Sequence, residues 1–139
     1  SNSFTGVLPV EVINPNLVIL DVSANHMSGS IPSVLKGQIS SLSYLSLNQN
    51  RFTGPLPLLN TDVFSYDVSD NSFTGTLPSA VSQGVASISV AGTLVEGTLP
   101  ATLFSSSVLH SVNVSGTQIG TFVLFVNPRC ILCVVVVMN

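Results

Sequence analysis

Charge is what this sequence lacks most. Charged residues make up 6% of the 139 residues, compared with about 25% in an average soluble domain. The formal net charge is −3, and the basic residues are Lys36, Arg51 and Arg129. Because nucleic-acid binding depends on Lys and Arg that neutralise phosphates, we expect no nucleic-acid partner. Serine, threonine and asparagine must supply much of the polar surface, which fits an extracellular location better than a cytosolic one.

The sequence also lacks catalytic and metal-binding motifs. Its two cysteines form a single C-x-x-C at Cys130 and Cys133, and a zinc site would need further ligands nearby. We interpret both as small apolar core residues, with their redox state left open. No G-x-S-x-G string, glycine-rich phosphate loop or close pair of carboxylates was found in the sequence. We therefore expect a protein that is not an enzyme, with no metal and no small-molecule cofactor.

No secretory leader opens the chain, since a basic region followed by an apolar run is missing, and the first residue is Ser1 rather than Met. The sequence begins at the Asn of a repeat, without the strand segment that precedes this Asn in the other copies. We therefore expect a fragment of a longer array.

Internal repeats are the strongest feature that is present. The string F-T-G-x-L-P occurs at residues 4–9, 52–57 and 73–78, with variants at 27–32 and 95–100. An L-x-x-L-x-L-x-x-N pattern precedes each later copy. Its last position holds Asn2, Asn25, Asn50, Asn71, Thr93 and Thr117. These positions are 23, 25, 21, 22 and 24 residues apart, within the range of about 20–29 that is typical of leucine-rich repeats.

At these residues the chain resembles the plant-type leucine-rich repeat, whose consensus is L-x-x-L-x-L-x-x-N-x-L-x-G-x-I-P. That class occurs in plant receptor-like proteins and kinases, polygalacturonase-inhibiting proteins and several protist surface antigens. Thr93 and Thr117, each preceded by Gly, depart from the plant consensus and are similar to some protist antigens. The resemblance implies a solenoid of the α/β horseshoe class, a right-handed stack with a parallel concave sheet.

Elementary physical chemistry supports the same fold. Alternation in L-x-L is the period of a strand with one buried face, and one repeat cannot bury its apolar side without stacked neighbours. Proline in nearly every convex segment predicts short 3₁₀ turns and a second, minor strand around G-x-L-P, with little α-helix. We expect the following residues to return to the core: Phe4, Met27, Phe52, Phe73, Val95 and Ile119.

The Asn ladder is predicted to hold the stack together. An amide both donates and accepts hydrogen bonds, so each Asn can satisfy backbone groups of its own repeat and of the next one. We expect Asn50 and Asn71 to be buried. The repeats occupy residues 1–120, as one partial and about five complete copies of 21–25 residues.

Residues 121–139 form an irregular apolar C-terminal segment. A spanning helix needs about 20 apolar residues, and Pro128 and Arg129 interrupt this run. We expect an atypical last repeat or cap built from strands. A truncated membrane anchor or a frame error near the end of the gene is the alternative.

Side chains between the buried positions should all point to the concave side, where solenoids usually bind their partners. The early repeats carry larger and acidic residues there, and the later ones carry mostly serine. Tyr44 is the leading contact residue, because large aromatic anchors contribute most to interface energy. The predicted ligand-binding residues are Ile19, Asp21, Tyr44, Ser46, Asn48, Ser65, Asp67 and Ser69.

These features predict a recognition module that binds a protein or peptide, in a cell-surface or secreted protein. A structural or adhesive coat protein without a specific ligand is one alternative, and an enzyme inhibitor that acts by binding is another. Membrane attachment would require sequence outside the chain or at its C-terminal end. Asn113 begins the N-x-S sequon that is free of proline and is a candidate N-glycosylation site.

Overall fold

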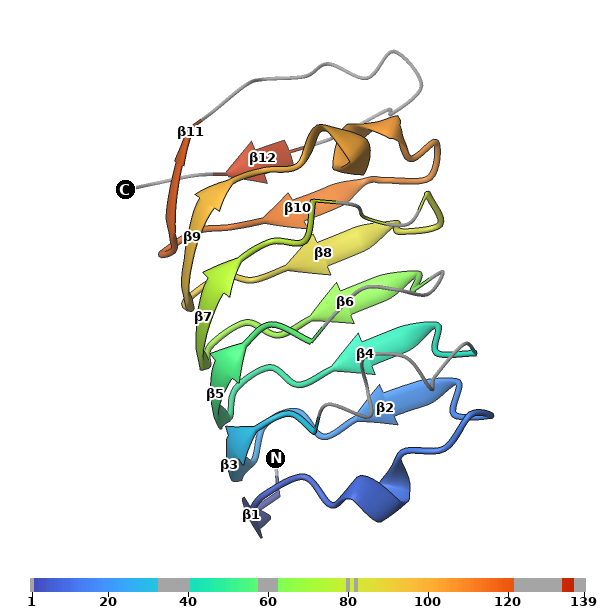
Figure 1. The fold of residues 1–139 in the computed structure, drawn as a ribbon, viewed down its shortest axis with the longest axis vertical. Coiled ribbons are helices and arrows are strands. Elements are labelled where there is room, and N and C mark those ends of the chain that lie inside the picture. The colour runs from blue at the N-terminus through green and yellow to red at the C-terminus, as the bar shows by residue number, and fades with distance from the viewer. Residues whose placement is uncertain are drawn as a thin grey trace.

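Two parallel sheets run the length of the molecule, because each repeat contributes one strand to each sheet (Figure 1). The computed structural model describes residues 2–32, 41–57, 63–79, 81, 83–121 and 134–136. Successive repeats stack on one another, so β1 and β12 lie at opposite ends of the stack. The predicted leucine-rich-repeat solenoid is confirmed.

The first sheet is built from the L-x-L segments and has the order β12-β10-β8-β6-β4-β2. From β2 to β10, the middle residue of each strand is buried and its two neighbours are half-buried or exposed, as the alternation predicted. The strands pair in register, so one repeat position lies beside the same position of the next. The strands are β2 (Ile19–Asp21), β4 (Tyr44–Ser46), β6 (Ser65–Asp67), β8 (Ser87–Ser89), β10 (Ser111–Asn113) and β12 (Val134–Val136).

The second sheet follows the ladder position of each repeat and has the order β1-β3-β5-β7-β9-β11. Four of its strands have five residues each, so these strands are more extensive than the minor strand that the sequence predicted. The reason is that this segment has an alternation of its own, with a buried apolar residue between two exposed or half-buried ones. Its strands are β1 (Thr5–Gly6), β3 (His26–Ser30), β5 (Arg51–Pro55), β7 (Ser72–Thr76), β9 (Leu94–Thr98) and β11 (Gln118–Thr121).

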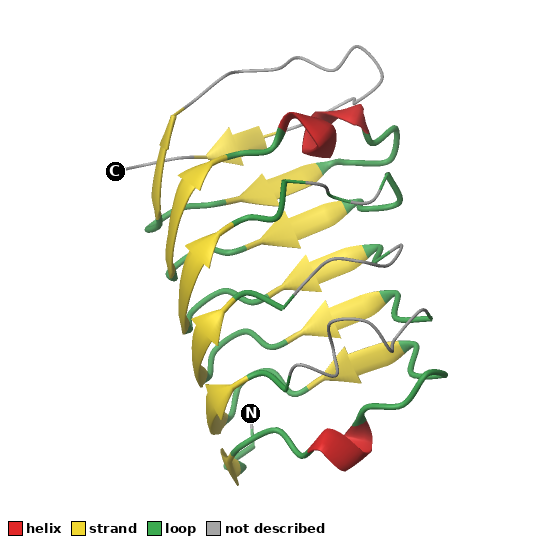
Figure 2. Ribbon diagram, in the orientation of Figure 1, coloured by secondary structure: helices red, strands yellow, loops and turns green. Residues whose placement is uncertain are grey.

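Helical structure is confined to two short 3₁₀ turns in the part of the chain that the structure describes (Figure 2). They are η1 (Val10–Val12) and η3 (Ala101–Ser105). Pro9 and Pro100 precede them with φ of −66° and −67°, the angle that the proline ring imposes. The expectation of 3₁₀ turns in place of α-helices is confirmed.

The core lies between the two sheets and forms one continuous cluster along the stack. Phe52 and Phe73 occupy equivalent positions of adjacent repeats and stack with their ring centroids 6.2 Å apart. Met27, Val95 and Ile119 are buried at the same position, as expected.

Phe4 contradicts the expected core list, because its side chain is 65% exposed. It occupies the first copy of the repeat position that Phe52 and Phe73 fill. A ring at this position is enclosed when repeats lie on both sides of it, and the structure shows a neighbouring repeat on one side of Phe4, through the β1–β3 pairing.

Side-chain amides link the early repeats. The Oδ1 atoms of Asn25, Asn50 and Asn71 accept hydrogen bonds from backbone N–H groups of the preceding repeat at 3.0, 2.9 and 2.9 Å. The Nδ2 atoms of Asn50 and Asn71 donate to the carbonyls of Val22 and Leu47, both at 2.9 Å. The amides therefore bridge to the preceding repeat, rather than to the next one as expected. Asn71 is buried, whereas Asn50 is half-buried, contrary to the prediction.

The two threonines of the ladder make shorter-range contacts. Thr93 donates to the carbonyl of Val90 at 2.6 Å, and Thr117 donates to that of Val114 at 2.7 Å. Both acceptors belong to the same repeat as the donor. A hydroxyl has one hydrogen, and because each threonine donates it within its own repeat, neither can also donate to the preceding repeat as the amides of Asn50 and Asn71 do.

From Asn25 onward, the residue before each ladder position adopts a left-handed backbone. The φ angle is 52° at Ala24 and 51° at Asp70, and glycine fills the same place at Gly92, with φ 62°. A Cβ on Gly92 would lie 2.6 Å from the Asp70 carboxylate. A side chain at residue 92 would therefore have to displace the Asp70 carboxylate, whereas Ala24 and Asp70 show that other residues tolerate the backbone angle.

The C-terminal segment contributes β12, which pairs with β10 in the same parallel register as the other strands. Most of residues 121–139, including Cys130 and Cys133, lie outside the described residues. The boundary at residue 120 and the identity of this segment remain predictions. No helix among the described residues is long and apolar enough to span a membrane.

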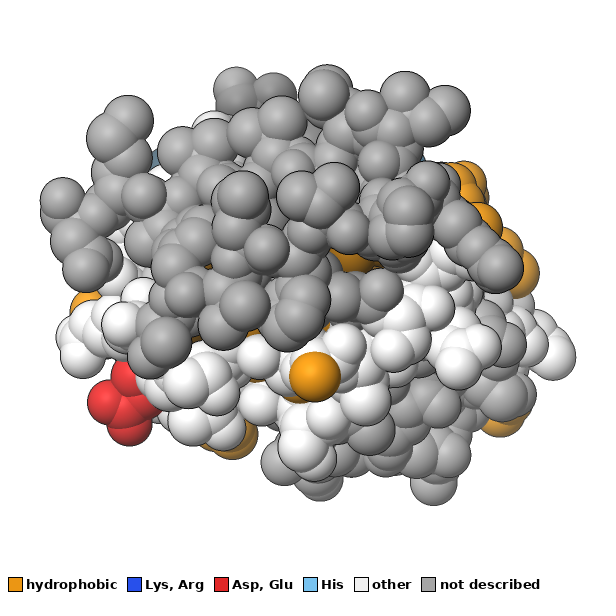
Figure 3. All heavy atoms as spheres, turned by 90° about the horizontal axis from the view of Figure 1, so that it is seen from above, with side chains coloured by type: hydrophobic (Ala, Val, Ile, Leu, Met, Phe, Trp, Pro, Cys, Tyr) orange, Lys and Arg blue, Asp and Glu red, His pale blue; other side chains and the backbone are white. Residues whose placement is uncertain are grey.

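Uncharged groups make up most of the described surface, consistent with the composition. Figure 3 views the stack from the end that Figure 1 places at the top, and among the described atoms white polar and backbone groups far outnumber the charged ones.

The ladder predicts the effect of losing one amide. Asn71→Ala leaves the buried Phe52 N–H without its acceptor, so the free energy of unfolding should fall by about 1–3 kcal/mol. Asn50→Ala should follow the same direction, and Thr93→Asn should be neutral or stabilising. Urea unfolding followed by circular dichroism measures all three. Urea unfolding midpoints equal to the parent's for both alanine variants would contradict the bridging role.

Tyr66 predicts a loss of stability at alkaline pH. Its hydroxyl is buried and donates to the Pro57 carbonyl at 3.1 Å, and burial raises the pKa of Tyr66 far above its ordinary value. The unfolded chain ionises this phenol near pH 10, whereas the folded chain keeps it neutral. The stabilisation is therefore complete below about pH 10 and is lost as the pH rises further.

Unfolding free energies measured on both sides of that pH should show the slope. Tyr66→Phe should flatten it, while costing about 1 kcal/mol at neutral pH through the lost hydrogen bond. The exposed Tyr44→Phe is the matched control and should keep the parent slope. A parent-like slope in Tyr66→Phe would assign the pH dependence to another group.

Candidate ligand-binding site

The open face of the first sheet collects the predicted ligand-binding residues. Because successive residues of a strand point to opposite sides, the first and third residues of each strand face away from the core. Ile19 and Tyr44 lie side by side on β2 and β4, and their side chains are 60% and 44% exposed. Large apolar side chains this exposed on a regular sheet are candidates for contact with a partner.

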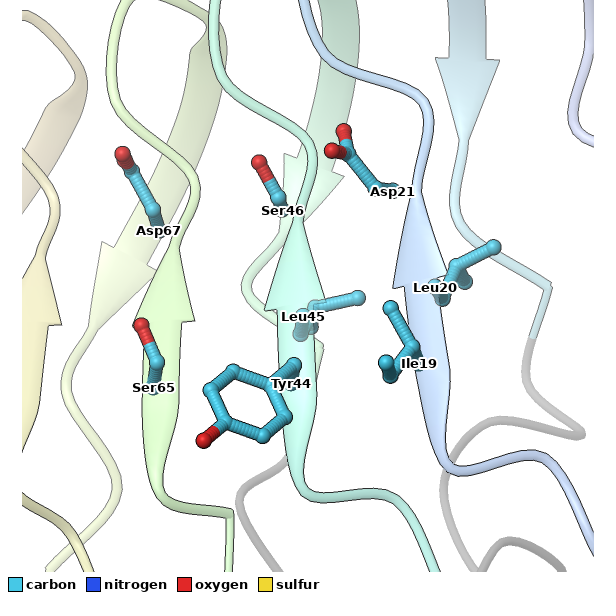
Figure 4. Close-up of a pocket in the computed structure, with 8 residues that line it drawn as sticks. All are labelled: Ile19, Leu20, Asp21, Tyr44, Leu45, Ser46, Ser65 and Asp67. Atoms are coloured by element: carbon cyan, nitrogen blue, oxygen red, sulfur yellow. The ribbon is translucent and has the colours of Figure 1, made fainter.

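A shallow hollow of about 310 Å³ lies on this face. Six of the eight predicted residues line it, and the buried Leu20 and Leu45 close its floor. Asn48 and Ser69 are half-buried, just beyond the strands, and are not among its lining residues. The predicted residues at the hollow are Ile19, Asp21, Tyr44, Ser46, Ser65 and Asp67 (Figure 4).

Phe64 joins this surface, although the sequence analysis did not include it among the site residues. Its ring centroid lies 5.7 Å from that of Tyr44, with the rings tilted by 53°, and its side chain is 43% exposed. Val18, one residue before β2, is 49% exposed. We call Val18, Ile19, Tyr44 and Phe64 the apolar patch. Phe64 and Val18 occupy the same repeat position as the smaller Ser43 and Ala86. This difference in size is the sequence feature that could have identified Phe64 as a surface residue of the site.

Two carboxylates lie at the other end of the strands. Asp21 Oδ1 accepts hydrogen bonds from the Ser23 hydroxyl at 2.7 Å and the Ser23 N–H at 3.0 Å. Asp67 Oδ1 accepts the equivalent pair from Ser69 at 2.6 and 3.0 Å. The side-chain and backbone hydrogen bonds from Ser23 lower the pKa of Asp21, against the opposing effect of burial. Asp21 is therefore ionised at neutral pH and held in one orientation.

The open face changes character in the later repeats. Ser87, Ser89 and Ala91 are half-buried, and their small side chains leave this part of the face without an apolar patch. Asn113 is exposed, and its Oδ1 accepts hydrogen bonds from Ser115 N–H and Oγ at 3.2 and 2.9 Å. Its exposure leaves the sequon accessible, and glycosylation there remains a prediction.

The described histidine and glutamate side chains lie in different repeats. Within the described part of the chain, no three His, Cys, Asp or Glu side chains gather closely enough to hold a metal ion. His26 and His110 are exposed and belong to different repeats. Glu11 and Glu96 are exposed and lie in different repeats.

Comparison with known proteins gives a consistent result. The family model for the Leucine Rich Repeat matches residues 16–38. Receptor-like protein 6 of Arabidopsis thaliana is 46% identical over 57 residues, which cover 40% of this chain and 6% of the relative. Receptor-like protein 35 of the same plant is 30% identical over 120 residues, which cover 86% of this chain and 10% of the relative. The chain thus spans a small part of the length of these relatives.

Among solved structures, the chain is similar to the ectodomain of the Arabidopsis receptor kinase HAESA in complex with an N-terminally extended IDA peptide hormone. The TM-score is 0.75 at 27% identity, and the match covers 83% of this chain and 20% of that one. The stack of two parallel sheets is therefore an architecture found in peptide-binding ectodomains.

Proposed function

Since the chain belongs to the plant-type leucine-rich-repeat family, we propose that it is a non-catalytic recognition module. It binds a protein or peptide on the open face of its first sheet, as part of a cell-surface or secreted protein. The observation that carries this proposal is the hollow beside the apolar patch, which groups the large exposed side chains of the early repeats on one face.

Two further facts support this function. The HAESA structure, similar in fold, contains a peptide hormone ligand, and the relatives with matching sequence are named receptor-like proteins. The surface has few charges, so specificity must come from shape, apolar contact and hydrogen bonding. Tyr44 is suited to this role, because a ring with a polar tip contributes large contact area at low entropic cost.

A structural or adhesive coat protein is the second candidate. The observation that favours it is the later part of the open face, where serine predominates and no large anchor is exposed. An enzyme inhibitor would bind through the same face but would need a more charged surface there. Only two of the eight predicted residues, Asp21 and Asp67, are charged, so this function fits less well. Failure of the chain to retain any protein from extracellular material at micromolar concentration would favour the coat protein.

Single substitutions on the open face test the recognition role. With a partner captured from extracellular material and then purified, Tyr44→Ala should weaken binding about five- to ten-fold, because it removes the central aromatic anchor. Asp67→Ala should also weaken it. Ser89→Ala is the matched control on the same sheet, two strands beyond β4, and should bind like the parent. Surface plasmon resonance measures all four proteins, and parent-like binding by all three variants would locate the interface elsewhere.

A further inference from the structure

The hollow is polar at one end and apolar at the other. Ile19 and Tyr44 are the first residues of β2 and β4, whereas Asp21 and Asp67 are the last residues of β2 and β6. Figure 4 shows the carboxylates of Asp21 and Asp67 at one end of the strands, with Tyr44 and Ile19 at the other. A partner that fills the hollow therefore meets two different surfaces along the strand direction.

The distance between these two surfaces matches an extended peptide. The first and third residues of a strand are separated by roughly 6–7 Å. An extended peptide that follows the strand direction places alternate side chains on one face at the same spacing. Two side chains separated by one residue would therefore reach the apolar patch and the carboxylates together.

The two carboxylates favour a positive charge on the peptide side chain that reaches them. Asp21 and Asp67 flank Ser46 in the sheet register, so their backbones lie two strand spacings, or roughly 10 Å, apart. The described part of the chain has no cation on this face, since Arg51 begins β5 of the second sheet. Covering a carboxylate without a cation is unfavourable, because an ionised group loses its hydration.

The geometry of each carboxylate also favours a cationic partner. Oδ1 of each one is held by two hydrogen bonds from the serine two residues later. The side chains are thereby oriented before a partner arrives, which reduces the entropy lost on binding. The Oδ2 atoms are the acceptors that an ammonium or guanidinium group would use, in charge-assisted hydrogen bonds.

From these observations we infer that this site takes an extended peptide in which an apolar residue and a Lys or Arg are separated by one residue. The apolar side chain packs on the apolar patch, and the basic head group lies over Ser46, between Asp21 and Asp67. This inference rests on the proposed function and specifies the chemistry of its ligand.

A random peptide library displayed on phage, selected on the complete 139-residue chain, tests the inference without a known ligand. Enriched peptides should share an apolar residue and a Lys or Arg with one residue between them. Synthetic peptides of that pattern are then titrated by fluorescence anisotropy. Moving the basic residue next to the apolar one, or replacing it with Glu, should weaken binding at least about ten-fold, as expected for the loss of a charge-assisted hydrogen bond.

Protein variants show whether the carboxylates are responsible. Asp21→Asn and Asp67→Asn should each weaken binding of the enriched peptide about ten-fold, and the effect should shrink at high salt. Asp70→Asn is the matched control, because it removes the same charge from an exposed residue outside the hollow. Circular dichroism of each variant verifies that the fold is retained.

The outcomes separate this inference from the proposed function. Enriched peptides that lack a basic residue but lose binding in Tyr44→Ala would overturn the inference and leave the recognition role intact. Peptides with the predicted pattern that bind Asp21→Asn and Asp67→Asn as tightly as the parent would also overturn it. If the selection yields no peptide whose binding depends on Tyr44, the recognition role of this face and the inference both fail.

Discussion

The stack depends on satisfying backbone groups where each strand of the first sheet ends and the chain turns. At that turn the backbone leaves one sheet and enters the other, and N–H and C=O groups would be buried without partners. Asn50 and Asn71 solve this with one amide each, which accepts from the preceding repeat and donates to its carbonyl. Repeats joined in this way keep a common register, and this register allows the apolar positions to form one continuous core.

The same constraint produces the candidate site. Because every strand of the first sheet ends at an equivalent turn, residues that are far apart in the sequence are aligned side by side across the sheet. Asp21 and Asp67 reach the same edge of the hollow through this alignment, and each is oriented by a serine of its own turn. Tyr44 and Phe64 come together in the same way from neighbouring repeats. The open face is thus formed by residues at equivalent positions of successive repeats.

Periodicity predicted the sheet, the inward and outward positions and the members of the open face, because these depend on local alternation and on the repeat length. It could not predict burial that depends on the neighbours. Phe4 occupies the repeat position of a core residue and is exposed. Asn50 occupies the same ladder position as the buried Asn71 and is half-buried. Phe64 was missed because its position just precedes the strand. Phe64 belongs to the apolar patch because its ring contacts the large side chain of Tyr44 in the preceding repeat.

The exchange of asparagine for threonine along the ladder has a consequence for motion. Asn25, Asn50 and Asn71 link neighbouring repeats through their side chains, whereas the hydroxyls of Thr93 and Thr117 donate to carbonyls of their own repeat. Local opening is easier where fewer contacts cross between units. The amide protons of the later repeats should therefore exchange with solvent sooner than those of the earlier ones. The hollow is built on β2, β4 and β6, in the half of the molecule whose repeats are linked by asparagine side chains.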